Sequence, residues 1–146
     1  MSPHPAPSVA GPVVLVVAGG AVSQAAIART AELAAGALVT VVGVGSNGMC
    51  RTTEPEQVRR TVALAMSVLE STGIVAVGHI VTGSPARAVA RVARARGARV
   101  VILDQPGPSC GGQPAVGLMA ELRRRMYGSG TIVLAETDRR GGWVSA

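Results

Sequence analysis

The side chains that could carry chemistry are few in this sequence, and they form no familiar catalytic set. Lys is absent, which excludes the phosphate-binding motif G-x-x-x-x-G-K-[ST]. Residues 19–24 read GGAVSQ rather than G-x-G-x-x-G, and no G-x-S-x-G turn presents a nucleophilic serine. The two Cys and two His, at positions 4, 50, 79 and 110, lack the spacing of metal ligands or of a disulfide scaffold. We therefore expect no enzyme, no metal centre and a reducing compartment.

A candidate ligand site consists instead of small residues and one carboxylate at the ends of apolar runs. They are Ala18, Gly19 and Gly20 after the first run, Val44 at the end of the second, and Asp104, Gly107, Gly117 and Leu118 around and after the fourth. Ligands of open parallel sheets bind beyond the carboxyl ends of the strands, and free N–H groups of helix N-termini favour anions there. The alternative is that these glycines, among nineteen, only end helices and make turns.

Apolar runs and helical patterns alternate along the chain and indicate the elements that would position these residues. The runs predict strands at 12–18, 38–44, 75–81, 100–104 and 131–135, with helices at 24–35, behind 53–56, at 85–96 and at 117–126. Strict alternation of this kind predicts an α/β fold, with a five-stranded parallel sheet and helices on both faces. The apolar share of 48%, with no Phe, suits a core of Val, Ala, Leu and Ile.

The starts of three helices carry recognisable capping residues. Ser23 precedes the first helix, residues 53–56 fit the capping box S/T-x-x-E, and Ser84 with Pro85 opens the third helix. The second helix carries apolar residues at i, i+4, i+7 and i+11, which predicts a buried stripe. These four residues are Val58, Val62, Ala65 and Leu69.

Residues 12–136 are predicted to form one domain between a disordered, Pro-rich tail at 1–11 and a flexible tail at 137–146. The first residues have neither the basic start nor the apolar run of a signal peptide, and no apolar run reaches the length of a membrane span. We expect a cytoplasmic protein without a membrane association.

The net charge of +6 comes from fourteen Arg against eight acidic residues. Single-stranded and RNA partners are usually held by stacking on aromatic rings, and only Tyr127 and Trp143 are available, so nucleic-acid binding is not expected. Arg87, Arg91 and Arg94 recur on one helix face, which favours a solvated surface, with an acidic or phosphate partner as the alternative.

The order of elements and several short motifs resemble the universal stress protein family over residues 12–135. The motifs are S-x-x-A-I at 23–27, G-x-P-A at 83–86, the strand at 100–103, and two glycines, Gly107 and Gly117, with nine residues between them. The resemblance implies a Rossmann-like fold related to adenine nucleotide α-hydrolases. It also implies a non-catalytic stress-response role and a homodimer formed through the fifth strand, Thr131 to Ala135, whose free apolar edge invites pairing. A separate protein partner remains open.

Nucleotide-binding members of that family carry G-2x-G-9x-G-[ST] after the fourth strand. Here Asp104 replaces the first Gly, Leu118 replaces the Ser/Thr, and Ala18 stands where the family has an Asp. A carboxylate ~5 Å from a phosphate oxygen opposes binding by roughly 3 kcal/mol, more than the ~0.3–1 kcal/mol that a helix N-terminus supplies. We therefore expect ATP binding to be impaired or absent.

Asp104 allows three other interpretations. Its carboxylate could pair with Arg123 or Arg124, hold a Mg²⁺ ion that bridges to the phosphates of ATP or AMP, or cap its own loop as an Asx-turn.

Overall fold

The computed structural model describes residues 11–17, 21–44, 55–81, 84–104, 116–136 and 143–145. Residues 1–10 of the predicted tail at 1–11 and most of the loops between elements lie outside these ranges. The described strands are β1 (Val13–Val17), β2 (Ala21–Ser23), β3 (Val39–Val44), β4 (Ala76–Val81), β5 (Val100–Asp104), β6 (Ile132–Glu136) and β7 (Trp143–Ser145). The helices are α1 (Gln24–Ala34), α2 (Pro55–Ser71), α3 (Pro85–Arg96) and α4 (Val116–Arg125).

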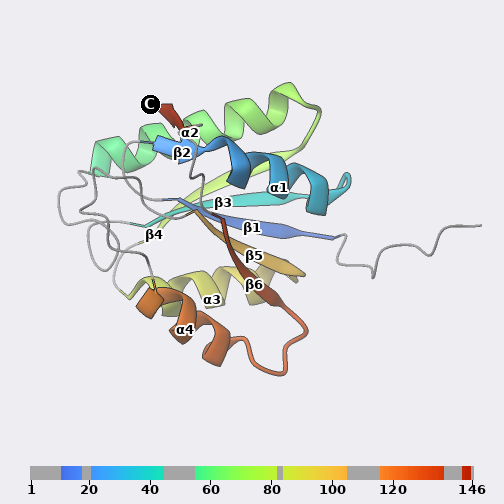
Figure 1. Cartoon of the computed structure of the whole chain (residues 1–146), viewed down its shortest axis with the longest axis vertical. Helices are drawn as coiled ribbons and strands as arrows, with labels where there is room; N and C mark the ends of the chain where they lie inside the picture. Colours follow the sequence, from blue (N-terminus) through green and yellow to red (C-terminus); the bar gives the residue numbers. More distant parts are fainter. Residues whose placement is uncertain are drawn as a thin grey trace, which may run out of the picture.

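Five of the strands in the described ranges form a parallel sheet with the order β4-β3-β1-β5-β6. Helices α1 and α2 cover one face of this sheet, and α3 and α4 cover the other (Figure 1). The prediction of an α/β fold with a five-stranded parallel sheet and helices on both faces is confirmed. Strands β1, β3 and β5 are buried at every position, as expected of apolar runs covered on both sides.

A second pairing was not predicted from the sequence. Strand β2 pairs antiparallel with β7, with Val22 opposite Val144. Residues 143–145 therefore form a strand, although they fall in the segment predicted to be a flexible tail. The difference arises because each strand has only three residues, so local patterning is too short to reveal a pairing between segments so far apart in the sequence.

The core beneath α1 and α2 depends on an unusually close approach of α2 to the sheet. The predicted stripe of α2 is confirmed, because Val58, Val62, Ala65 and Leu69 are all buried. A Cβ atom at Gly43 would lie 2.6 Å from Val58 Cγ1 and 2.7 Å from Val62 Cγ2. Glycine at position 43 thus lets the helix approach β3 more closely than any side chain would permit.

Two of the three predicted helix caps, those at Ser23 and Ser84, lie within the described residues, whereas residues 53 and 54 of the predicted capping box lie outside them. Ser23 caps α1 through its Oγ atom, which accepts a hydrogen bond from the Ala26 N–H at 2.9 Å. Ser84 is the N-cap of α3 with Pro85 in its first turn, but the Ser84 side chain makes no capping hydrogen bond. Gly97 ends α3 in the left-handed conformation, with φ of 62°.

The edges of the parallel sheet are β4 and β6, so the prediction that the last predicted strand lies at an edge is confirmed. Ile80 of β4 and Ile132 of β6 are exposed by 41% and 43%, respectively. Within the described ranges, no helix is long and apolar enough to cross a membrane.

Candidate functional site

The structure places part of the predicted site at the carboxyl edge of the sheet. Val44 ends β3 and Asp104 ends β5, whereas Gly117 and Leu118 lie in the first turn of α4. Ala18, Gly19, Gly20 and Gly107 lie outside the described residues.

Asp104 is enclosed beneath the start of α1. Its side chain is only 2% exposed, and its Oδ2 atom accepts a hydrogen bond from the backbone N–H of Ser23 at 3.1 Å. Its Oδ1 atom is buried and has no hydrogen-bond partner among the described residues. The side chain faces the α1–α2 side of the sheet, because it lies two residues after Ile102, which belongs to the core on that side.

The contact between Asp104 and Ser23 joins the end of β5 to the first residue before α1. Ser23 is fully buried and makes two contacts here. Its Oγ atom caps α1, and its backbone N–H donates a hydrogen bond to the Asp104 carboxylate. Asp104 therefore binds Ser23 in the described structure, rather than Arg123 or Arg124, both of which are exposed on α4. Its partner lies in a different loop, so it does not act as a local Asx-turn cap there.

Burial raises the pKa of Asp104 from 3.8 to about 7, although hydrogen bonds from the Ser23 backbone and side chain oppose this shift. The desolvation of the charged form outweighs these bonds because neither comes from a cation. Near neutral pH, the carboxyl group therefore changes between the neutral and the charged form.

Leu118 lies on the opposite face of the sheet. It is 9% exposed and belongs to the core under α3 and α4, together with Val44, Val16, Leu103 and Leu122. The position where the family motif requires a phosphate-binding hydroxyl is thus occupied by a side chain that packs into the core. Asp104 and Leu118, which are the first and last positions of the motif, face opposite sides of the sheet and do not converge on one pocket.

Two residues of this edge were not assigned to the site from the sequence. Ser23 was predicted as a helix cap and as the first residue of the S-x-x-A-I motif, and its hydrogen bond to Asp104 spans 81 positions. Glu136 pairs with Asp104 in the register of β5 and β6, so a second acidic residue stands beside it at the edge. A sequence signal existed for Glu136, which directly follows the last predicted strand. Among the described residues, His, Cys, Asp and Glu form no group of three that could hold a metal ion.

Comparison with solved structures finds the same fold in several universal stress proteins. No family model matches the chain, and no curated protein matches it. A universal stress protein family structure from Burkholderia pseudomallei has a TM-score of 0.60 at 20% identity, covering 90% of this chain and 98% of that one. The universal stress protein from Archaeoglobus fulgidus in complex with dAMP has a TM-score of 0.57 at 18% identity, covering 87% and 98%.

A third similar structure is a universal stress protein family protein from Arabidopsis thaliana with AMP bound. It has a TM-score of 0.54 at 12% identity and covers 88% of this chain and 93% of that one. The similarity in all three cases spans nearly the whole of both chains. The described sheet, its strand order and its helical layers therefore have the fold of universal stress proteins.

Proposed function

We propose that this protein is a universal stress protein with impaired or absent adenine-nucleotide binding, which acts in the cytoplasm as a non-catalytic regulatory or stress-response protein. The fold and the Gly107-x9-Gly117 spacing support the family assignment. The proposed loss of nucleotide binding rests on Asp104, which is buried and accepts a hydrogen bond from Ser23. Asp104 occupies the position at which the family motif begins with glycine.

The replaced motif positions oppose phosphate binding by two different means. Asp104 places a carboxylate where glycine leaves room for a ligand, and its charged form repels phosphate by roughly 3 kcal/mol at ~5 Å. Leu118 replaces the Ser or Thr whose hydroxyl would bind phosphate, and its side chain packs into the core under α3 and α4. The first effect weakens below pH 7, because Asp104 is then largely protonated. The second effect is independent of pH.

A second candidate function is adenine-nucleotide binding through an adapted loop with Mg²⁺ on Asp104. The unpartnered Oδ1 atom favours it, because a metal ion would satisfy that atom. Burial opposes it, since Mg²⁺ usually keeps several water ligands and Asp104 is only 2% exposed. The raised pKa also opposes it, because burial favours the neutral form of the Asp104 carboxyl group and its hydrogen-bond partner among the described residues, Ser23, carries no charge. The surroundings of Asp104 thus fit a protonated carboxyl group better than a metal ligand.

Calorimetric titration with ATP and with AMP, with and without Mg²⁺, tests both candidates. AMP and dAMP are the ligands of two similar structures, so adenine nucleotides are the appropriate probes. We expect no binding by the wild-type protein at pH 8, and a gain of up to about 100-fold in affinity for Asp104→Gly, which removes roughly 3 kcal/mol of repulsion. Glu32→Gln is the control, because it removes an exposed carboxylate of α1.

Two outcomes would change the assignment. Wild-type binding without Mg²⁺, at an affinity that Asp104→Gly does not improve, would show that the site is intact. Wild-type binding that requires Mg²⁺, with no Mg²⁺ dependence left in Asp104→Gly, would establish Asp104 as a metal ligand.

The proposal includes a homodimer formed through β6. The free edge of β6 and the exposed Ile132 support this interface. Ile132→Lys should therefore shift the sedimentation of the protein from dimer towards monomer, since Lys at an edge strand opposes pairing. Ile80→Lys is a matched control, because Ile80 lies on the other edge strand with nearly equal exposure. An equal shift in both variants, or a wild-type monomer, would exclude β6 as the interface.

A further inference from the structure

The positive charge of the chain is concentrated on one side of the sheet. Helices α3 and α4 together carry seven Arg and one Glu. Helices α1 and α2 carry three Arg and three Glu, so that layer has no net charge. The α3–α4 layer therefore accounts for a charge of +6, which equals the net charge of the whole chain. The sequence shows the number of Arg residues, but only the sheet order places α3 and α4 on the same face.

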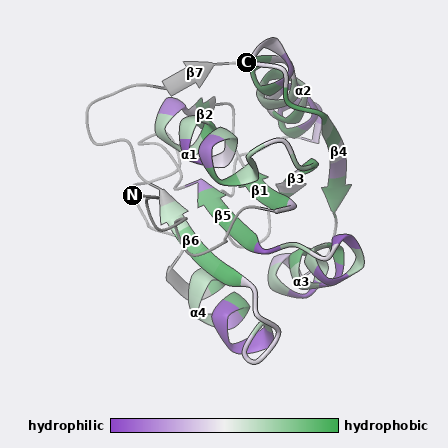
Figure 2. Ribbon diagram, turned by 90° about the vertical axis from the view of Figure 1, so that its right-hand side faces the viewer, coloured by the Kyte–Doolittle hydropathy of each residue, from purple (hydrophilic) through white to green (hydrophobic). Residues whose placement is uncertain are grey.

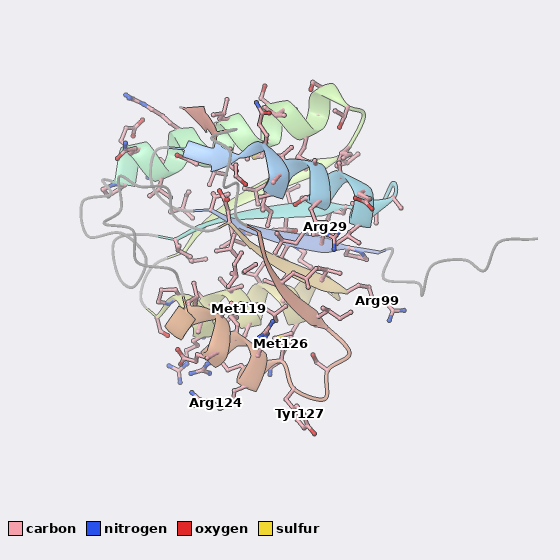
Figure 3. All side chains as sticks on the ribbon, in the orientation of Figure 1. Arg29, Arg99, Met119, Arg124, Met126 and Tyr127 are labelled. Atoms are coloured by element: carbon pink, nitrogen blue, oxygen red, sulfur yellow. The ribbon has the colours of Figure 1, made fainter. Side chains whose placement is uncertain are left out.

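Six of these residues, on the adjacent helices α3 and α4, are named here the arginine face: Arg87, Arg91, Arg94, Arg123, Arg124 and Arg125. All are exposed except Arg125, which is half-buried. The guanidinium of Arg94 donates a hydrogen bond to the Arg125 carbonyl oxygen at 2.6 Å, which joins the stripe of α3 to the end of α4. Figure 2 shows the hydrophilic outer sides of both helices, and Figure 3 shows Arg124 projecting away from the sheet.

This charge is hardly neutralised within α3 and α4 themselves. Glu121 is the single carboxylate in α3 and α4, and it pairs with Arg125 at 3.2 Å. The opposite layer shows the contrast, because its three Arg are balanced by three Glu. Holding several guanidinium groups together without carboxylates costs free energy through like-charge repulsion, which an anionic partner would relieve.

We propose that the arginine face binds the phosphate backbone of double-stranded nucleic acid without sequence preference, and this proposal is independent of the nucleotide-binding function discussed above. Guanidinium groups bind phosphate oxygens in pairs of parallel hydrogen bonds, more specifically than ammonium groups do. Arg87, Arg91 and Arg94 span about 10 Å along α3, over which a duplex presents several phosphates. The partner is thus a dense, regular array of negative charges.

The residues of α3 and α4 fit a membrane surface or a single-stranded nucleic acid less well than a duplex. A membrane-binding helix inserts apolar side chains into lipid, but the apolar sides of α3 and α4 are used in the core, where Val89, Ala93, Leu122 and Met126 are buried. Single strands need stacking rings, and α3 and α4 carry none, although the exposed Tyr127 follows α4 and the His79 ring contacts Arg96. The scarcity of rings among the described residues therefore disfavours base stacking, but it does not bear on contacts to duplex phosphates.

Fluorescence anisotropy with a labelled DNA duplex of mixed sequence and about 20 base pairs tests this proposal at about 50 to 200 mM salt. We expect a Kd in the micromolar range at low salt that weakens steeply as salt rises. The double variant Arg91→Gln/Arg124→Gln should bind about tenfold more weakly, and its salt dependence should be shallower by about two units of slope. Neither residue takes part in the hydrogen bond between α3 and α4, so the fold should be retained.

Arg59→Gln/Arg60→Gln is the matched control, because it removes the same charge from the exposed surface of α2 on the opposite layer. It should leave duplex affinity within about twofold of wild type, since α2 lies on the other face of the sheet and salt screens charges that are far from the duplex. Equal weakening by both variants would show general charge attraction and would overturn the proposal. Absence of duplex binding at low salt would overturn it too.

Two further probes distinguish the partner class. A single-stranded oligonucleotide that binds as tightly as the duplex would overturn the assignment to double strands. Vesicles of phosphatidylserine and phosphatidylcholine that bind the protein more tightly than the duplex, with loss in the α3–α4 variant, would assign the arginine face to membranes instead.

Discussion

Asp104→Asn should stabilise the protein by about 2–4 kcal/mol at pH 8 and should remove most of the pH dependence of its stability between pH 4 and pH 8. The carboxyl group has a pKa of about 7 in the folded protein and near 3.8 when unfolded. Between these values the folded state binds more protons than the unfolded state, so stability falls as pH rises through this window. A difference of about three units corresponds to about 4 kcal/mol once the pH exceeds 7.

Asparagine keeps the shape of the side chain and the acceptor that binds the Ser23 N–H, but it carries no charge. Its amide group lacks a described partner at the Oδ1 position, which offsets part of the gain by about 1 kcal/mol or more. Urea unfolding at several pH values from 5 to 8 measures the effect. Glu32→Gln, on the exposed surface of α1, should leave the pH profile unchanged. A wild-type profile that is flat between pH 5 and pH 8 would contradict the raised pKa.

Gly43→Ala should be the most damaging conservative change in the sheet, with a loss of about 3 kcal/mol, the upper range for overpacking in a filled core. The added methyl would lie 2.6 Å from Val58 and 2.7 Å from Val62, and both of these buried valines are stiff at χ1. Relief therefore requires α2 to move away from β3. Chemical unfolding monitored by circular dichroism gives the loss directly.

A double-mutant cycle identifies the cause of this loss. Val62→Ala removes one of the two clashing groups, so Gly43→Ala should cost at least about 1 kcal/mol less in that background than in the wild type. Additive effects would show that helix α2 is not the obstacle. Gly78→Ala is a useful comparison, because its new methyl meets the flexible Met66 Sδ at 2.7 Å as well as Val62. It should therefore cost less than Gly43→Ala.

The main sheet and its helices could be predicted because their signals are local. Val13–Val17 and Val100–Leu103 are continuous apolar runs, and Ser23 and Pro85 mark helix starts within a few residues. The short β2–β7 pair could not be predicted, because it depends on a contact between distant segments of three residues each. The contacts of the candidate site also join distant segments, so they could not be predicted from the sequence either.

Asp104 was identified from its place in the motif, but its surroundings required the tertiary structure. Its partner Ser23 lies 81 positions away in the sequence. The residues around Asp104 in the sequence therefore could not show whether its side chain is buried or exposed. The alternation along β5 and the packing of α4 then place Asp104 and Leu118 on opposite faces, although both belong to the same motif. From the sequence alone, Arg87, Arg91 and Arg94 are interpreted as a solvated helix face. The structure adds that α3 and α4 lie side by side, which brings the Arg residues of both helices together.

The edge position of β6 has a consequence for symmetry. Two copies that pair antiparallel through this strand are related by a twofold axis perpendicular to the sheet, and such a rotation leaves each face of the sheet on its own side. Both arginine faces would then lie on one side of a continuous ten-stranded sheet, because each copy contributes the five strands described here. Parallel pairing would place them on opposite sides. In the proposed dimer, the direction of β6 pairing would thus decide whether both subunits engage one long duplex or bridge two.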